Sequence, residues 1–185
     1  MQRPEQLESE WREGSYVDRF ALQYFECAEQ PFRRLKKRLP GRGDELQRYE
    51  SVAKSLVQGA IRDLRPPYRR PKQMYVLVRA SVLTGVLYYA LREAGSVLQV
   101  TLHLIGIDRS AQQCGLGRRC LEEFMSKVKQ EARLKAVSRV EISTVVNQKN
   151  SASQALLTRF GFTHTGRVSD HPYLGTWALV GESAA

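Results

Sequence analysis

The chain has 185 residues, a net charge of +10 and 42% hydrophobic residues, which fits a single globular domain whose basic surface favours partners that carry negative charge. No apolar run approaches the roughly 20 residues that cross a bilayer, and the polar N-terminus lacks the apolar segment of a secretory signal. The three cysteines form no C-x-x-C pair, which argues against a disulfide framework or a zinc cage and favours a reducing cytoplasmic setting.

The N-terminal part of the chain has no clear period. Residues 1–43 mix aromatic and basic residues, and we expect at most a first strand and a helix in this segment, which we assign to the same domain as residues 44–185. The first regular pattern predicts a helix over Glu45 to Leu64, because its apolar residues recur in steps of three and four. Asp44 is its expected N-cap, with Gln47 as capping-box partner.

Short apolar segments rich in β-branched and aromatic residues follow this helix. Met74 to Ala80, Gly85 to Leu91 and Val97 to Ile107 are separated by turn residues, which predicts an antiparallel meander. The remaining pattern predicts, in order, a helix over 115–134, a strand over 139–146, a short helix over 150–160 and a closing strand pair over 162–168 and 175–180.

A glycine-bearing loop stands where the third of these strands gives way to a helix. The segment from Gln112 to Arg118 contains Gly115 and Gly117, and Arg118 is followed by a second arginine. The first amides of a helix have no partner within it, and the helix dipole adds positive charge at the same end. Glycine lets a phosphate approach the backbone closely, so the loop predicts an anion site, with a plain tight turn as the alternative.

The wider pattern resembles the GNAT N-acetyltransferase superfamily over roughly residues 74 to 180. The pattern Gln112-x-x-Gly115-x-Gly117 after an apolar strand is similar to the family's pyrophosphate motif. Downstream, Asn150, a short helix and Phe160-Gly161-Phe162 resemble its later motif. The resemblance implies an α/β (α+β) fold: a mixed, mostly antiparallel twisted sheet with helices on both faces and a splayed central strand pair.

The resemblance also implies acetyl-CoA as co-substrate and no metal. The pantetheine would pair with the backbone of Ile105, Gly106 and Ile107, one of whose amides would stabilise the thioester oxyanion. Asn150 would bind pantetheine or, as an alternative drawn from its position, cap a helix. The implied pyrophosphate site consists of Gln112, Gln113, Cys114, Gly115, Leu116, Gly117 and Arg118.

The expected catalytic residues match the family pattern less well than the cofactor-binding residues do. Leu157 stands where many family members have the tyrosine that protonates the leaving thiolate, so Tyr173 or solvent is the candidate acid. His103 is the candidate base, since the histidine pKa of about 6.5 suits proton abstraction at neutral pH. Glu141 on the neighbouring strand is a second candidate. Each candidate also has a purely structural alternative: His103 as a packed core histidine, Glu141 as a solvent-facing side chain and Tyr173 as a surface aromatic.

These observations predict a transferase that moves an acetyl group from acetyl-CoA to a primary amine of unidentified kind: a small molecule, a protein or an aminoacyl-tRNA. A weaker resemblance to the family's tRNA-acetylating toxins, together with the basic charge, makes tRNA or another polyanion a candidate partner. A homodimer is also left open. The alternative from another class is a non-catalytic module of the same fold that binds acyl-CoA or a partner.

Overall fold

The computed structural model describes residues 9–27, 57, 59, 60, 62, 72–169 and 171–182. The N-terminal elements are β1 (Ser9–Glu13) and α1 (Asp18–Gln23). The predicted helix over Glu45 to Leu64 lies mostly outside the described residues, but the four that are described there, Val57, Gly59, Ala60 and Arg62, are helical. The later elements are β2 (Lys72–Arg79), β3 (Val82–Ala94), β4 (Val97–Ile107), the 3-10 turn η1 (Arg109–Ala111), α3 (Leu116–Leu134), β5 (Arg139–Asn147), α4 (Ser151–Arg159), β6 (Thr163–Val168) and β7 (His171–Glu182).

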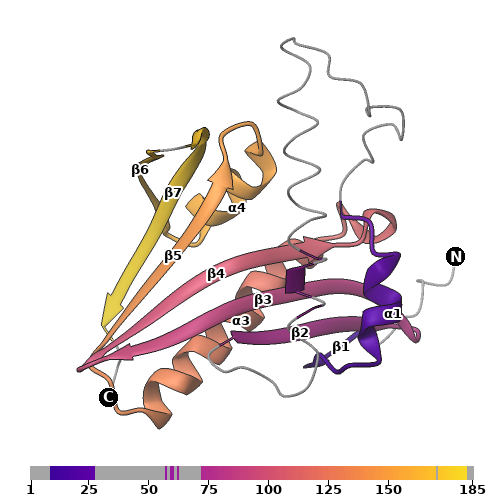
Figure 1. Ribbon diagram of the computed structural model, residues 1–185, viewed down its shortest axis with the longest axis horizontal. Coiled ribbons are helices and arrows are strands. Elements are labelled where there is room, and N and C mark those ends of the chain that lie inside the picture. Colours follow the sequence, from indigo (N-terminus) through magenta and orange to yellow (C-terminus); the bar gives the residue numbers. More distant parts are fainter. Residues whose placement is uncertain are drawn as a thin grey trace, which may run out of the picture.

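These strands form one seven-stranded sheet in the order β1-β2-β3-β4-β5-β7-β6. Every neighbouring pair is antiparallel except β4 and β5, which run parallel at the centre. Helix α3 covers one face and α1 lies at the other (Figure 1). The expected fold class is therefore confirmed. The predicted meander, the helices over 115–134 and 150–160, the strand over 139–146 and the closing strand pair appear with bounds shifted by a few residues.

The core has two main parts, one on each face of the sheet. The apolar stripe of α3 fills the larger part and includes the five residues that its periodicity predicted: Leu116, Leu121, Phe124, Val128 and Ala132, all buried. Phe124 meets the ring of Tyr89 edge to face, with centroids 5.2 Å apart. On the opposite face, Leu22 and Phe25 pack with Val86, Tyr88 and Leu104.

A bulge in β4 exchanges the faces that its side chains occupy. Tyr88 of β3 lies opposite Leu104 whereas Tyr89 lies opposite Leu102, so His103 is an extra residue in β4. Before the bulge, the even-numbered Leu98, Val100 and Leu102 pack with α3; after it, Leu104 packs on the α1 face, and Ile105 and Ile107 lie against the α3 core. One strand therefore contributes to both cores.

An ion pair anchors the short helix α1 to the edge strand β1. Arg12 donates to both carboxylate oxygens of Asp18, at 2.8 and 2.6 Å, and the Ser15 amide donates to Asp18 at 2.7 Å. Burial raises the pKa of Asp18, but the hydrogen bonds from Arg12 and Ser15 together outweigh it, so the pKa lies below its usual value.

This lowered pKa predicts a pH dependence of stability. The carboxylate of Asp18 contributes stability above its unfolded pKa of about 3.9, and the contribution is lost as the pH falls through the lower folded value. Urea unfolding of wild type and Asp18→Asn should therefore show a large stability difference at pH 6 that shrinks toward pH 3. Glu13→Gln, which removes an exposed carboxylate from the same strand, is the control and should show a much smaller difference; a pH-independent gap for Asp18→Asn would contradict the account.

Candidate functional site

The two parallel strands at the centre of the sheet separate part of the way along. The pairing of β4 with β5 ends at Leu102 and Thr144, although β4 continues to Ile107 and β5 to Asn147. Beyond this point the strands diverge (Figure 1). At the last pair, the buried hydroxyl of Thr144 donates to the Leu102 carbonyl at 2.8 Å. The backbones of the two strands thus form a V at their carboxyl ends, called the opening below, as expected for a splayed central pair.

The register on β3 decides which backbone groups of β4 face this opening. The Asp108 amide donates to the Thr84 carbonyl on β3 at 2.8 Å. Because the direction of backbone groups alternates along a strand, those of Gly106 also point to β3, and those of Ile105 and Ile107 point toward the opening. The Ile107 carbonyl already accepts from the Gln112 side chain at 3.0 Å. Of the three expected pairing residues, Ile105 and the Ile107 amide are thus the best placed.

A segment from the N-terminal part of the chain braces the end of β4. The Phe25 ring lies so close to Gly106 that an added Cβ would meet it at 3.0 Å. The Glu26 carbonyl accepts from the Arg109 amide at 2.7 Å, and the Cys27 carbonyl accepts from Gln112 Nε2 at 2.8 Å. Sequence reasoning missed this brace, because no local pattern signals contacts across more than 80 residues.

The loop before α3 presents backbone amides at the same end of the sheet. Gly115 is the N-cap, with φ +76, and Gln113 also has a positive φ of 62. The first bond along the helix runs from the Arg119 amide to the Gly115 carbonyl at 3.2 Å, so the amides of residues 116–118 precede it. The structure therefore provides the group of helix N-terminal amides that an anion site needs.

The side chains of the predicted pyrophosphate residues differ in what they do. Leu116 is 4% exposed and packs into the core, so only its backbone is available to a ligand. The Gln112 side chain holds two carbonyls, as described above. Cys114 is exposed, and Arg118 is exposed and pairs with Glu122 at 2.7 Å. The site is consequently made mainly of main-chain groups, with Arg118 and Arg119 adding charge nearby.

Asn150 takes the capping position that its sequence context offered. Its side chain accepts from the Ser153 amide at 3.1 Å, which caps α4. Gly117 lies within van der Waals reach of Leu156, since an added Cβ would be 3.7 Å from that side chain, so α4 packs next to the first turn of α3. The capping role of Asn150 is confirmed, and its contact with pantetheine stays a prediction.

His103 lies where the two central strands separate. It is the extra residue of the bulge, directly after the last paired residue of β4, and its partly buried ring lies 5.2 Å from that of Tyr88. Glu141 is placed differently: it pairs with Gln99 in the closed part of the sheet and forms an ion pair with Arg139 at 3.0 Å. Only His103 of these two is brought to the opening.

Tyr173 and Leu157 occupy different environments. Tyr173 is 43% exposed and lies next to the end of β5, where its carbonyl accepts from the Gln148 amide at 2.8 Å. Leu157 is 4% exposed and belongs to the main core. The position expected for a tyrosine acid is therefore a packing position in this chain. Cys120 is buried as well, and burial raises the pKa of its thiol, which makes it a poor nucleophile.

Other kinds of site find little support in the described part of the chain. Its side chains include no cluster of three or more His, Cys, Asp or Glu placed to hold a metal ion. None of its helices has the length and apolar character needed to cross a membrane. Two hollows in this part of the chain lie along the C-terminal half of α3 and not at the opening, so hollow volume does not locate the chemistry here.

A sheet split at a parallel central pair, with a helix N-terminus beside the split, defines a class of coenzyme A-dependent acyltransferases. Residues 46–162 match the Acetyltransferase (GNAT) family. This match spans more than half of the chain, and the protein belongs to the GNAT acetyltransferase family, whose members use acetyl-CoA. A comparison with curated protein sequences finds no match.

Solved structures share the whole fold. An acetyltransferase from Thermus thermophilus is 21% identical, with a TM-score of 0.63 over 95% of this chain and 98% of that one. The PaiA N-acetyltransferase from Thermoplasma acidophilum, in complex with coenzyme A, is 13% identical, with a TM-score of 0.57 over 92% and 98%. A mutant AtaT toxin bound to the C-terminus of the antitoxin AtaR and acetyl-CoA is 16% identical, with a TM-score of 0.58 over 95% and 94%. These likenesses establish the fold.

The bond that closes the strand ladder makes a testable contribution to stability. Thr144→Val keeps the shape of the side chain but removes the donor to the buried Leu102 carbonyl, which should lower the free energy of unfolding by about 1–3 kcal/mol. Thr163→Val is the matched control, because the Thr163 hydroxyl is exposed and its 3.4 Å contact is long. Equal urea unfolding curves for Thr144→Val and wild type would show that this bond does not stabilise the junction.

Proposed function

We propose that this protein transfers the acetyl group of acetyl-CoA to a primary amine by direct attack of the amine on the thioester. The observation that carries the proposal is the end of the β4–β5 ladder at Leu102 and Thr144, beyond which main-chain groups of β4 face an opening. Buried backbone groups at such an opening need hydrogen-bond partners, and a linear ligand containing amides can supply them.

The residues present fit coenzyme A. Ile105 can pair with the amides of pantetheine, and the amides at the start of α3 can bind its pyrophosphate, assisted by Arg118 and Arg119. An added Cβ at Gly115 would meet no heavy atom within 4 Å, so glycine is required there for its positive φ and leaves the loop surface open. The expected pantetheine contact at Ile105 and the expected pyrophosphate contact at the start of α3 lie at the same end of the sheet.

The chain's own groups have defined roles in the proposed reaction. When bound, acetyl-CoA supplies an activated acetyl thioester. The Ile107 amide faces the opening and is suited to stabilise negative charge on the carbonyl oxygen. His103 is suited to accept the proton that the attacking amine releases. As the new C–N bond forms, the C–S bond breaks and the thiolate takes a proton from Tyr173 or solvent. Glu141, in the closed part of the sheet, is a weaker candidate base.

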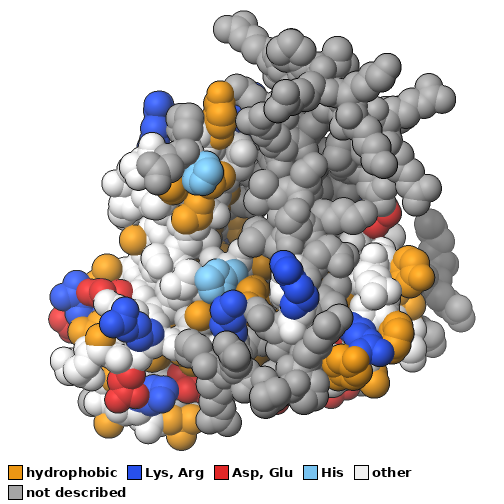
Figure 2. Space-filling view, viewed as in Figure 1, with side chains coloured by type: hydrophobic (Ala, Val, Ile, Leu, Met, Phe, Trp, Pro, Cys, Tyr) orange, Lys and Arg blue, Asp and Glu red, His pale blue; other side chains and the backbone are white. Residues whose placement is uncertain are grey.

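The acceptor is an amine whose identity the fold does not define. The net charge of +10 supports an anionic partner such as tRNA, and the toxin among the structural relatives makes a macromolecular acceptor worth testing. Figure 2 shows the basic side chains of the described residues spread over the visible face and not gathered into one patch. We therefore place small amines first and treat aminoacyl-tRNA as the second class of acceptor.

The cofactor site is tested by a pair of glycine variants. Gly115 and Gly95 both have positive φ, +76 and +61, and an added Cβ would meet no atom within 4 Å at either position. Gly115→Ala and Gly95→Ala should thus cost similar stability, about 1–2 kcal/mol, because an L-residue is strained in this conformation. Calorimetric titration should show weaker coenzyme A binding for Gly115→Ala alone. Equal affinities in the two variants would argue against the loop as the phosphate site.

Catalysis is tested by thiol release from acetyl-CoA with a panel of primary amines and aminoacyl-tRNA. His103→Gln should lower kcat by about 100-fold or more while leaving the affinity for coenzyme A unchanged, because a general base acts on the amine. His164→Gln, which changes an exposed histidine in β6, is the matched control and should keep full activity.

Three further outcomes have distinct meanings. Full activity of His103→Gln would show that His103 is not the base, so that Glu141 or solvent accepts the proton, and it would leave the acetyltransferase assignment intact. Coenzyme A binding without turnover on any acceptor would favour the non-catalytic binding module. Failure to bind any coenzyme A derivative would contradict the proposed function as a whole.

A further inference from the structure

An apolar hollow lies between the C-terminal half of α3 and the strands β5 and β7. Its volume is about 330 Å³, within the range of about 300–1,000 Å³ that small-molecule pockets occupy. Its apolar wall consists of Met125, Val128, Ala132, Val140, Ile142 and Leu179.

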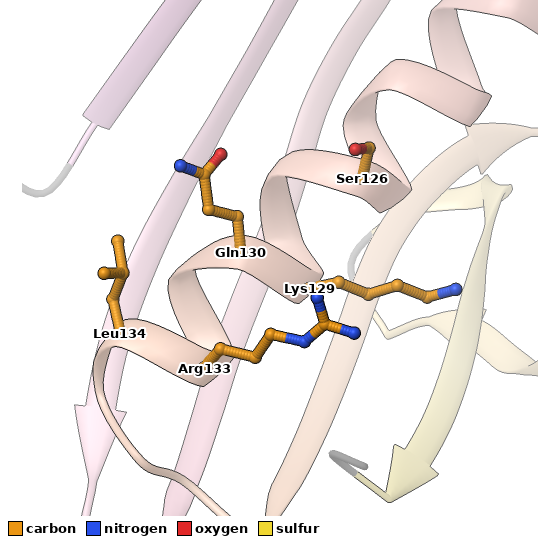
Figure 3. Close-up of a pocket in the computed structure, with 5 residues that line it drawn as sticks. All are labelled: Ser126, Lys129, Gln130, Arg133 and Leu134. Carbon is orange, nitrogen blue, oxygen red and sulfur yellow. The ribbon is translucent and has the colours of Figure 1, made fainter. Parts of the chain in front are cut away.

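Two cationic residues separate this hollow from a second, more polar one. Lys129 and Arg133 line both hollows, and Ser126, Gln130 and Leu134 complete the second, which has a volume of about 460 Å³. Figure 3 shows the Lys129 and Arg133 side chains extending from α3 in the same direction. The apolar hollow also has one carboxylate at its border, that of Glu182.

Helix α3 carries two exposed cations one turn apart at this point. Two other cations of the helix have ion-pair partners: Arg118 pairs with Glu122 at 2.7 Å, and Lys127 pairs with Glu123 at 3.1 Å. Lys129 and Arg133 stand four positions apart on one face, where like charges repel, and neither has an ion-pair partner among the described residues. An anion held between them would relieve this repulsion.

We propose that the paired hollows bind a single-chain carboxylate of medium length. Its tail would lie in the apolar hollow, where it would cover the partly exposed side chains of Met125, Val140 and Leu179. Its carboxylate would lie between Lys129 and Arg133; the Gln130 side chain extends away from these two (Figure 3). An apolar wall, two unpaired cations and neighbouring polar groups together match a ligand with one anionic head and one apolar chain.

This site is separate from the opening described above. Val140 pairs with Gly181 at the closed end of the sheet, and three residues of β5 lie between Val140 and Thr144, where β4 and β5 part. The same helix serves both places, because the N-terminus of α3 carries the glycine loop and its C-terminal half carries the hollow. Occupancy of the hollow by a carboxylate should therefore not compete with coenzyme A.

Sodium octanoate is the probe, titrated calorimetrically into the full-length protein with and without saturating coenzyme A. Wild type should bind one equivalent in a saturable manner under both conditions, and octanol, which has the same chain without the charge, should bind more weakly. The double variant Lys129→Gln/Arg133→Gln should bind octanoate at least tenfold more weakly. The control pair Arg92→Gln/Arg159→Gln removes the same total charge at exposed positions outside α3 and should stay within twofold of wild type.

A filling variant tests the apolar half of the site. Gly181 lines the hollow, and an added Cβ there would meet no atom within 4 Å, so Gly181→Leu can occupy the space without displacing the core. It should abolish octanoate binding and leave coenzyme A binding intact. The proposal is overturned if octanoate does not saturate, if coenzyme A displaces it, or if neither the charge variant nor the filling variant weakens binding more than the control pair does.

Discussion

The separation of β4 from β5 is the constraint on which the rest of the site depends. Parallel strands side by side satisfy each other's backbone groups, so a sheet can part at its centre only if the groups at the junction find other partners. Two features meet at that junction: the Thr144 hydroxyl holds the Leu102 carbonyl, and the bulge at His103 changes the course of β4. Together they end the ladder at a defined residue pair.

The bulge has a second consequence, because it lets one strand serve two cores. Without the extra residue, the alternation of β4 would keep its even-numbered side chains on the α3 face along its whole length. With it, Leu104 packs on the α1 face and the β4 segment beyond the junction is braced by Phe25, Glu26 and Cys27. The opening is thus supported from the N-terminal part of the chain, and that support keeps its backbone groups in a fixed direction.

The proposed anion site depends on backbone more than on side chains. Leu116 is a core residue, Gln112 holds two carbonyls and Asn150 caps α4, so three of the residues predicted to contact the cofactor have structural duties. Their positions in the motif are explained by what they stabilise: the conformation of the loop that presents the amides. Leu157 likewise belongs to the core, so the position at which the family resemblance implies a tyrosine acid serves packing in this chain.

The sequence by itself determined the elements from β2 onward, the α3 stripe, the glycine loop and the family, because these features follow from local periodicity and from motifs within one turn or strand. The bulge at His103, the direction of the Ile105 and Ile107 backbone, the brace from residues 25–27 and the remoteness of Glu141 were decided only by the tertiary structure. Each depends on pairing register or on contacts between residues far apart in the chain. A one-residue shift in register reverses every side chain and leaves the local pattern unchanged.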